Sequence, residues 1–185
     1  FKAPVLFTST SEIYGNPLEH PQTEEYFGNV NSFGPRSCYD EGKRVAESLM
    51  YEYKNKGLDI RLCRIFNTYG PFMNEEDGRV IYNFIGQAIN NTPITIYGDG
   101  KQTRCFCFID DTINCLIKLM NSNYTNPINI GNNNEITIKQ LALTIKSLVQ
   151  SDSEFIYKNM PIDDPIRRRP DISKAKSKLD WAPRT

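Results

Sequence analysis

Several features that mark specialised classes of protein are scarce or missing in this chain of 185 residues. Its 22 basic and 22 acidic side chains give a formal net charge of +0, so no overall field draws it to nucleic acid or to an anionic membrane. No apolar run approaches the roughly 18 residues that a membrane-spanning helix requires. The one histidine and the five cysteines, none in C-x-x-C spacing, argue against a zinc site and against a disulfide scaffold. We therefore expect no nucleic-acid partner, no membrane segment and no metal centre in this chain.

What is present is the pattern of a globular α/β protein, long enough to bury roughly 70% of its unfolded surface. Strands are predicted at residues 4–8, 59–66, 94–97 and 103–108, in a short segment ending at 129–131, and at 154–158, and helices at 37–56, 79–91, 110–120, 137–149 and 171–179. This alternation predicts functional residues at the carboxyl ends of parallel strands. Because the glycine-rich dinucleotide fingerprint is absent, the chain is either a different α/β domain or the latter part of a Rossmann enzyme.

Polar residues mark the boundaries of these elements. Gly98-Asp99-Gly100 predicts a turn between two β segments, since such turns need backbone positions with positive φ. The acidic pair at 110–111, Thr137 and Asp171 are predicted to cap the helices that they precede. Glu75-Glu76-Asp77 is predicted to form a solvated loop.

One pair of side chains indicates chemistry. Tyr39 and Lys43 stand four residues apart, so they share one face at the start of the helix predicted at 37–56. An ammonium beside a phenol stabilises the phenolate, which is a base usable near neutral pH. The segment 8–15, at the end of the first strand, adds hydroxyls that can align a substrate alcohol, and the carboxylate of Glu12. Taken alone, the Tyr-x-x-x-Lys spacing is also what a solvated pair on a helix gives.

The context of this pair resembles a known family. Thr10, Tyr39 and Lys43 resemble the Ser/Thr-Tyr-Lys triad of the extended short-chain dehydrogenase/reductases, which include sugar-nucleotide epimerases, dehydratases and decarboxylases. The resemblance covers nearly the whole chain and continues through the segments 64–71, 98–104 and 130–132.

The resemblance implies an α/β fold, namely the C-terminal portion of a Rossmann-type doubly wound parallel sheet plus a smaller α/β substrate-binding subdomain. Residues 1–72 would form the latter part of the NAD-binding domain and carry the triad. Residues 73–185 would mainly bind a UDP-sugar, with some strands and helices returning to the Rossmann core. The cofactor implied is NAD, contacted by Thr10, Tyr39 and Lys43.

Within this superfamily, three features resemble the UDP-glucuronate decarboxylases. In the segment 10–12, Ser11 stands where 4,6-dehydratases carry an aspartate that they use as an acid, so dehydration is disfavoured. The segment 31–44 is similar to the decarboxylase stretch around the catalytic tyrosine. The basic segment 167–171 resembles a late motif whose arginine lies beside the substrate carboxylate, and that arginine is Arg168 in this sequence.

The resemblance also implies a role for each site residue. Tyr39 removes the C4 hydroxyl proton during hydride transfer, and Thr10 and Tyr39 hydrogen-bond the oxyanion that develops during loss of CO2. Glu12 and Arg168 act near C5: Arg168 binds the carboxylate in a bidentate fork or helps to deliver a later proton, and Glu12 destabilises the leaving carboxylate. The residues implied in substrate binding are Asn67, Arg79, Arg104 and Arg168.

Two alternatives to NAD-dependent decarboxylation of UDP-glucuronate to UDP-xylose remain. A UDP-sugar 4-epimerase, for example of UDP-glucuronate, uses the same triad to oxidise C4, but it must avoid loss of CO2 and has no need of Glu12 and Arg168. A catalytically silent sugar-nucleotide-binding fragment is the other alternative, because the glycine-rich NAD-binding motif is absent. We expect the 185 residues alone to bind NAD weakly and to turn over little.

The assembly and location of the protein are expectations too. The resemblance suggests that the helix at 37–56 joins a homodimeric bundle. The chain begins with Phe1, not Met, and ends at Thr185 where relatives continue, so we expect a longer natural protein. Cysteines used as free thiols favour a cytoplasmic protein, although an anchor in a preceding segment would place it in the Golgi lumen.

Overall fold

The computed structural model describes residues 3–74 and 77–185. A three-stranded parallel sheet forms one part of it, in the order β1 (Val5–Thr10), β2 (Ile60–Ile65) and β7 (Ile128–Ile130). Every residue of β2 except the last is buried, as expected for a central strand covered on both faces. Since the three strands run in one direction, their carboxyl ends meet at the same edge of the sheet.

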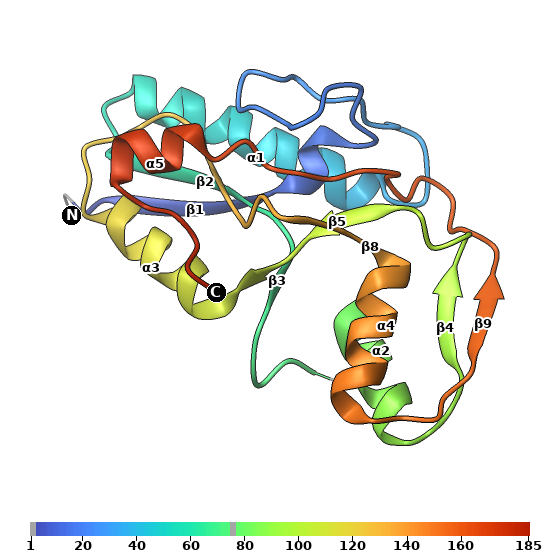
Figure 1. The fold of residues 1–185 in the computed structure, drawn as a ribbon. Helices are drawn as coiled ribbons and strands as arrows, with labels where there is room; N and C mark the ends of the chain where they lie inside the picture. The colour runs from blue at the N-terminus through green and yellow to red at the C-terminus, as the bar shows by residue number, and fades with distance from the viewer. Residues whose placement is uncertain (1–2, 75–76) are drawn as a thin grey trace.

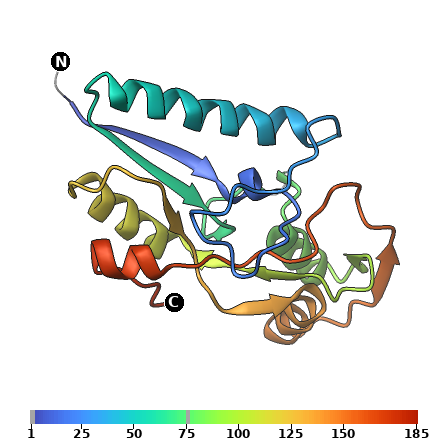
Figure 2. The same cartoon turned by 90° about the horizontal axis from the view of Figure 1, so that it is seen from above.

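Helices cover both faces of this sheet, as Figure 2 shows. Helix α1 (Ser37–Asn55) connects β1 to β2 and lies along one face, while α3 (Ile109–Met120) and α5 (Ser173–Leu179) lie on the other. The core beneath α3 and α5 comprises Cys63, Cys107, Cys115, Leu119, Ile128, Ile130, Ile172, Ala175, Leu179 and Trp181. We call the sheet and these three helices the sheet layer, and its doubly wound arrangement confirms the predicted fold class.

Four further elements pack together beside the sheet layer, at the lower right of Figure 1. They are α2 (Val80–Ile89), α4 (Ile138–Val149) and the parallel pair β4 (Ile94–Tyr97) and β9 (Phe155–Lys158). Their core is apolar and comprises Ile81, Phe84, Ala88, Ile94, Ile96, Ile138, Leu141, Ala142 and Ile145. We call these elements the second lobe.

Short elements connect the two parts. They are the 3-10 helix η1 (Ser11–Tyr14) and the strands β3 (Thr68–Tyr69), β5 (Thr103–Cys105), β6 (Cys107–Phe108) and β8 (Glu135–Thr137). Strand β3 pairs with β6 and β5 pairs with β8. The sequence predicted neither β3 nor β8, because two or three residues are too few to show a periodicity.

The turn at the Asp-Gly segment is present, but the strands that it joins do not pair with each other. Gly98 and Gly100 have φ of 67° and 75°, as the turn requires. Strand β4 pairs with β9 and β5 pairs with β8, so neither forms a hairpin across the turn. The single strand predicted at 103–108 is divided into β5 and β6.

The predicted helix caps had different outcomes. Thr137 caps α4 as predicted, in a capping box with Gln140. The prediction for the pair at 110–111 is wrong: α3 starts after Phe108 with no side-chain cap, and Asp111 Oδ2 instead accepts hydrogen bonds from the backbone near the end of the chain. Asp171 Oδ1 accepts from the Ser173 amide at 2.8 Å, but the residue at the N-cap of α5 is Ile172, so Asp171 lies one residue before the cap that was predicted for it.

Other sequence expectations can be placed on the structure. All five cysteines are free thiols; four are buried, and burial raises the pKa of Cys63 to about 12. Glu75 and Glu76 lie outside the described residues, and Asp77 pairs with Arg79. Across the two described ranges, no helix has the length and apolar character to span a membrane, and no group of three potential ligand side chains could hold a metal ion.

Candidate active site

A cavity of about 630 Å³ opens at the carboxyl ends of β1 and β2, between the sheet layer and the second lobe. Its wall includes every site residue named from the sequence: Thr10, Glu12, Tyr39, Lys43, Asn67, Arg79, Arg104 and Arg168. They come from segments as far apart as β1 and the stretch before α5, so the fold brings them together. A cavity at the end of parallel strands is where an α/β sheet normally binds its ligand.

Thr10 and Glu12 are placed by the way β1 ends. Thr10 is the last residue of the strand, and its Oγ1 accepts a hydrogen bond of 3.2 Å from the Glu12 amide as the cap of η1. The 3-10 turn therefore changes the chain direction at once and presents a hydroxyl and a carboxylate two residues apart beside the cavity.

Tyr39 and Lys43 lie in the first turns of α1, next to the same strand end. Lys43 Nζ donates to the Thr8 carbonyl oxygen at 3.0 Å and lies 5.9 Å from the centroid of the Tyr39 ring. The Tyr39 residue is 53% exposed, so its ring is open to a ligand. An ammonium carries three N–H donors, so the bond to Thr8 leaves others for a bound group.

Glu12 is held between two arginines. Both terminal nitrogens of Arg168 donate to its carboxylate, one at 2.9 Å, and Arg36 Nη2 donates at 2.6 Å. The Glu12 side chain is only 15% exposed, and burial alone would raise its pKa. The charges and hydrogen bonds of Arg168 and Arg36 outweigh burial and hold the pKa of Glu12 below its ordinary value.

The ion pairs continue beyond Glu12. Arg36 Nη1 lies 3.9 Å from Asp164 Oδ1, and Arg104 Nη2 donates to Asp164 Oδ2 at 2.8 Å. We call Glu12, Arg36, Arg104, Asp164 and Arg168 the ion cluster. Three guanidinium groups face two carboxylates in it, which leaves an excess of positive charge on the cavity wall.

Sequence reasoning missed Arg36 and Asp164. Arg36 immediately precedes α1 and lies 24 residues from its partner Glu12, and Asp164 lies 60 residues from Arg104. The one available signal is that Arg36 stands a helical turn before Tyr39. Spacing along one element does not reveal partners that come from different elements.

The two remaining residues differ in their surroundings. Asn67 lies two residues after the end of β2, and its carbonyl oxygen accepts a hydrogen bond from the Cys107 amide at 2.9 Å, which fixes the backbone at the cavity. Arg79 precedes α2 at the rim, where its side chain is largely exposed and its Nε donates to Asp77 Oδ2 at 2.6 Å.

Comparison with curated proteins gives close relatives. The chain is 55% identical to UDP-glucuronic acid decarboxylase 6 of Arabidopsis thaliana, over 98% of this chain and 53% of that protein. It is 53% identical to UDP-glucuronic acid decarboxylase 1 of Xenopus tropicalis, over 98% of this chain and 43% of that protein. The resemblance to these decarboxylases is therefore confirmed, and the chain spans about half the length of the relatives that it matches.

Solved structures share the fold at lower identity. A UDP-glucose 4-epimerase of Thermotoga maritima superposes with a TM-score of 0.91 at 26% identity, over 98% of this chain and 59% of that chain. A UDP-glucuronic acid 4-epimerase of Bacillus cereus, solved with UDP-glucuronic acid and NAD, gives 0.88 at 26% identity, over 98% and 57%. The family model described as GDP-mannose 4,6 dehydratase matches residues 2–185. Because this match spans nearly all of the sequence, the chain belongs to that family.

Proposed function

We propose that this protein converts UDP-glucuronate to UDP-xylose by NAD-dependent decarboxylation through a C4-keto intermediate. The observation that carries the proposal is the position of Glu12, bound to Arg168 and Arg36 in the cavity that also holds Thr10 and Tyr39. Relatives named UDP-glucuronic acid decarboxylase, at 49% to 55% identity, support it.

The residues around Tyr39 fit an NAD nicotinamide and ribose. Thr10, Tyr39 and Lys43 line one side of the cavity, and the Lys43 ammonium keeps N–H donors that a ribose hydroxyl can accept. These three residues would hold that end of the cofactor. NAD, when bound, supplies the hydride acceptor for C4 and later returns the hydride.

Tyr39 acts as the base of the first step. Its phenolate removes the proton of the C4 hydroxyl, while the positive charge of Lys43 stabilises the phenolate. The C5 carboxylate of the resulting 4-keto sugar belongs to a β-keto acid, so the electrons left by departing CO2 delocalise into the ketone. Tyr39 and Thr10 can donate hydrogen bonds to the oxyanion that develops there.

The ion cluster provides the environment for the C5 carboxylate. Its excess positive charge attracts an anionic sugar, and the buried Nε atoms of Arg36 and Arg168 have no hydrogen-bond partner within the described ranges, so each has an N–H left to donate. Both terminal nitrogens of Arg168 already donate to Glu12, so they are not free to bind a substrate carboxylate in a bidentate way. The substrate carboxylate would instead interact with the ion cluster as a whole. The negative charge of Glu12 beside that carboxylate would favour loss of CO2.

The test is product analysis of the full-length protein supplied with UDP-glucuronate and NAD. UDP-xylose is the expected product, and released 4-keto pentose would still be a decarboxylation. UDP-galacturonate would replace the proposal with 4-epimerisation, and the absence of any reaction would reject it. Tyr39→Phe is expected to lower C4 oxidation by about 10²- to 10⁴-fold.

Arg168→Ala separates the two steps of the reaction. It is expected to suppress release of CO2 more than oxidation at C4, so that NADH accumulates. The exposed neighbour Arg167 gives a matched control, and Arg167→Ala is expected to keep normal UDP-xylose output. An Arg168→Ala enzyme that also keeps normal output would remove Arg168 from the mechanism.

A homodimer is proposed as well. Val45, Leu49 and Tyr53 on α1 are exposed apolar residues, which supports the use of this helix in an interface. Sedimentation of the full-length protein tests the proposal, and a monomer at micromolar concentration would contradict it.

A further inference from the structure

We propose that Glu47 is a positioning residue, which holds α1 against β1 and β2 so that Tyr39 and Lys43 face the end of β1. The inference rests on the proposed function, in which Tyr39 and Lys43 act at C4. Glu47 lies outside the cavity that holds the site residues, so its effect would pass through the helix.

The first argument is the spacing along α1. Tyr39, Lys43 and Glu47 are four residues apart in sequence, so they follow one another down one face of the helix. Lys43 Nζ bonds the carbonyl of Thr8 at 3.0 Å, and Glu47 Oε1 accepts from Ser9 Oγ at 2.5 Å. Two consecutive turns of α1 are thus bound to two consecutive residues of β1, directly before Thr10.

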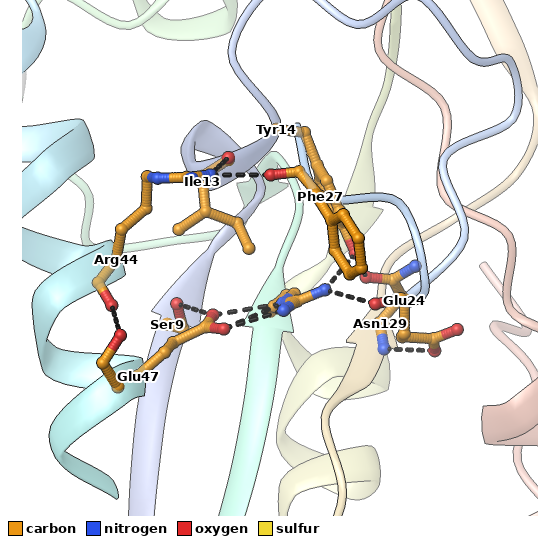
Figure 3. A network of polar contacts seen from close by, with 10 residues as sticks. Ser9, Ile13, Tyr14, Glu24, Phe27, Arg44, Glu47 and Asn129 are labelled. Atoms are coloured by element: carbon orange, nitrogen blue, oxygen red, sulfur yellow. Dashed lines mark hydrogen bonds and ion pairs between the residues drawn. The ribbon is translucent and has the colours of Figure 1, made fainter. Parts of the chain in front are cut away.

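The second argument is that Glu47 also binds the neighbouring strand. Arg64 on β2 is the register partner of Ser9, and its Nε and Nη2 donate to the Glu47 carboxylate at 3.1 and 2.8 Å. The side chains of Arg64 and Glu47 are 10% and 13% exposed. Figure 3 shows Glu47 extending from α1 to Ser9. One carboxylate therefore fixes the helix to β1 and β2 together, through a bidentate pair of defined geometry.

The third argument is that Arg64 is itself held in place. Its Nη1 donates to Tyr14 Oη and to the Glu24 carbonyl oxygen, each at 2.9 Å. Tyr14 Oη in turn donates to the side-chain oxygen Oδ1 of Asn129 on β7 at 2.8 Å. The backbone N–H of Asn129 donates to the Glu24 carboxylate, also at 2.8 Å. Figure 3 shows this network crossing from α1 to β7. Glu47 thus binds α1 to an arginine whose own position in the sheet is fixed by several hydrogen bonds.

Displacements of about 1 Å in a reacting group can cost roughly 100-fold in rate, which gives the expected scale. In the full-length protein, Glu47→Ala is expected to lower kcat for C4 oxidation by about 10- to 100-fold, with little change in KM for UDP-glucuronate. The pH profile of NADH formation is expected to move to higher pH, because Lys43 would stabilise the phenolate less well. Glu47→Gln, which keeps an acceptor for Ser9, should rescue part of the loss.

Glu52→Gln provides the matched control, since Glu52 is an exposed carboxylate on the same helix. It is expected to leave kcat and the pH profile unchanged. A Glu47→Ala protein with lower stability but wild-type kcat and pH profile would reduce Glu47 to a structural role and overturn the inference. If Glu47→Ala does not fold, Ser9→Ala is the variant to use, because it removes the hydrogen bond to Glu47 and keeps the ion pair with Arg64. The kcat of Ser9→Ala is expected to fall about fivefold, and an unchanged kcat would also overturn the inference.

The outcome can be separated from the proposed function. A wild-type protein that makes UDP-galacturonate refutes decarboxylation but still oxidises C4, so the kinetic comparison of Glu47 variants stands. Amide hydrogen exchange over residues 37–43 needs no substrate: it should be roughly tenfold faster in Glu47→Ala than in Glu52→Gln. Equal exchange in the two variants would contradict the inference in a protein of any activity.

Discussion

The sheet layer buries charged side chains, whereas the core of the second lobe consists of apolar ones. Arg64 lies in the sheet layer with all of its terminal nitrogens bonded, and Arg61, on the same strand, is buried and pairs with the exposed Asp59. In the second lobe, Phe84 and Leu141 pack among aliphatic side chains between α2, α4 and β4. The stability of the buried charges depends on the direction of their hydrogen bonds and on pairing with opposite charges. The stability of the apolar core depends mainly on the apolar area removed from water.

The difference matches what each part contributes to the cavity. The sheet layer supplies Tyr39, Lys43 and Thr10, and the chemistry proposed for them requires fixed relative positions. The second lobe supplies walls such as Phe84 and Ile138, where volume matters more than orientation. A buried polar network suits the first task, because each bond restricts an angle as well as a distance.

The largest expected effect compares one substitution in each part. Arg64→Leu and Phe84→Ala should each lower the free energy of unfolding by about 3–5 kcal/mol, the first by leaving the Glu47 charge unpaired and the second by creating a cavity. Adding Glu47→Leu to Arg64→Leu should restore part of the loss, because no unpaired carboxylate remains. Urea denaturation measures these variants and Glu47→Leu alone, and simple additivity of the Glu47 and Arg64 substitutions would contradict a coupled pair.

A smaller effect concerns the dependence on pH. The pKa of Glu12 is held low in the folded protein, so its contribution is complete above the unfolded-state pKa of about 4.3 and is lost as the pH falls through the folded-state value. The free energy of unfolding of the wild type should exceed that of Glu12→Gln by about 2 kcal/mol at pH 7, as measured by urea denaturation. This difference in stability should become smaller below about pH 5. The difference in the free energy of unfolding between wild type and Phe84→Ala should stay constant over the same pH range. A difference for Glu12→Gln that also stays constant would contradict a stabilising role for the ion pairs of Glu12.

The smallest effect tests a local element of the second lobe. Thr137→Ala removes the capping box of α4 and is expected to cost about 1 kcal/mol in thermal or urea unfolding. Thr144, exposed in the middle of the same helix, is the matched control, and Thr144→Ala should change the stability by less than about 0.5 kcal/mol. Equal effects at both positions would mean that the cap contributes nothing.

Much of the fold follows from local sequence signals. The helix predicted at 37–56 is α1 at Ser37–Asn55, and the strand predicted at 94–97 is β4 with the same limits. Both have an apolar periodicity within one element, which local physics determines. The partners of β4 and β5 could not be predicted in this way, because a turn specifies a change of direction and not which distant strand completes the pairing.

The sequence by itself determined the pairs that lie within one element or at its end. Tyr39 with Lys43 follows from helical spacing, and Thr10 with Glu12 follows from the end of a strand. Arg168 was named through resemblance to a family, since nothing in its local spacing points to Glu12, which lies 156 residues away.

Only the tertiary structure decided which charges meet. It placed Arg36 and Asp164 in the ion cluster, and it placed Glu47 of α1 against Arg64 of β2. The physical reason is that burial makes a charge costly unless an opposite charge arrives with suitable geometry. Which side chain meets that requirement depends on how the parallel strands and the second lobe pack, and no spacing along the chain contains that information.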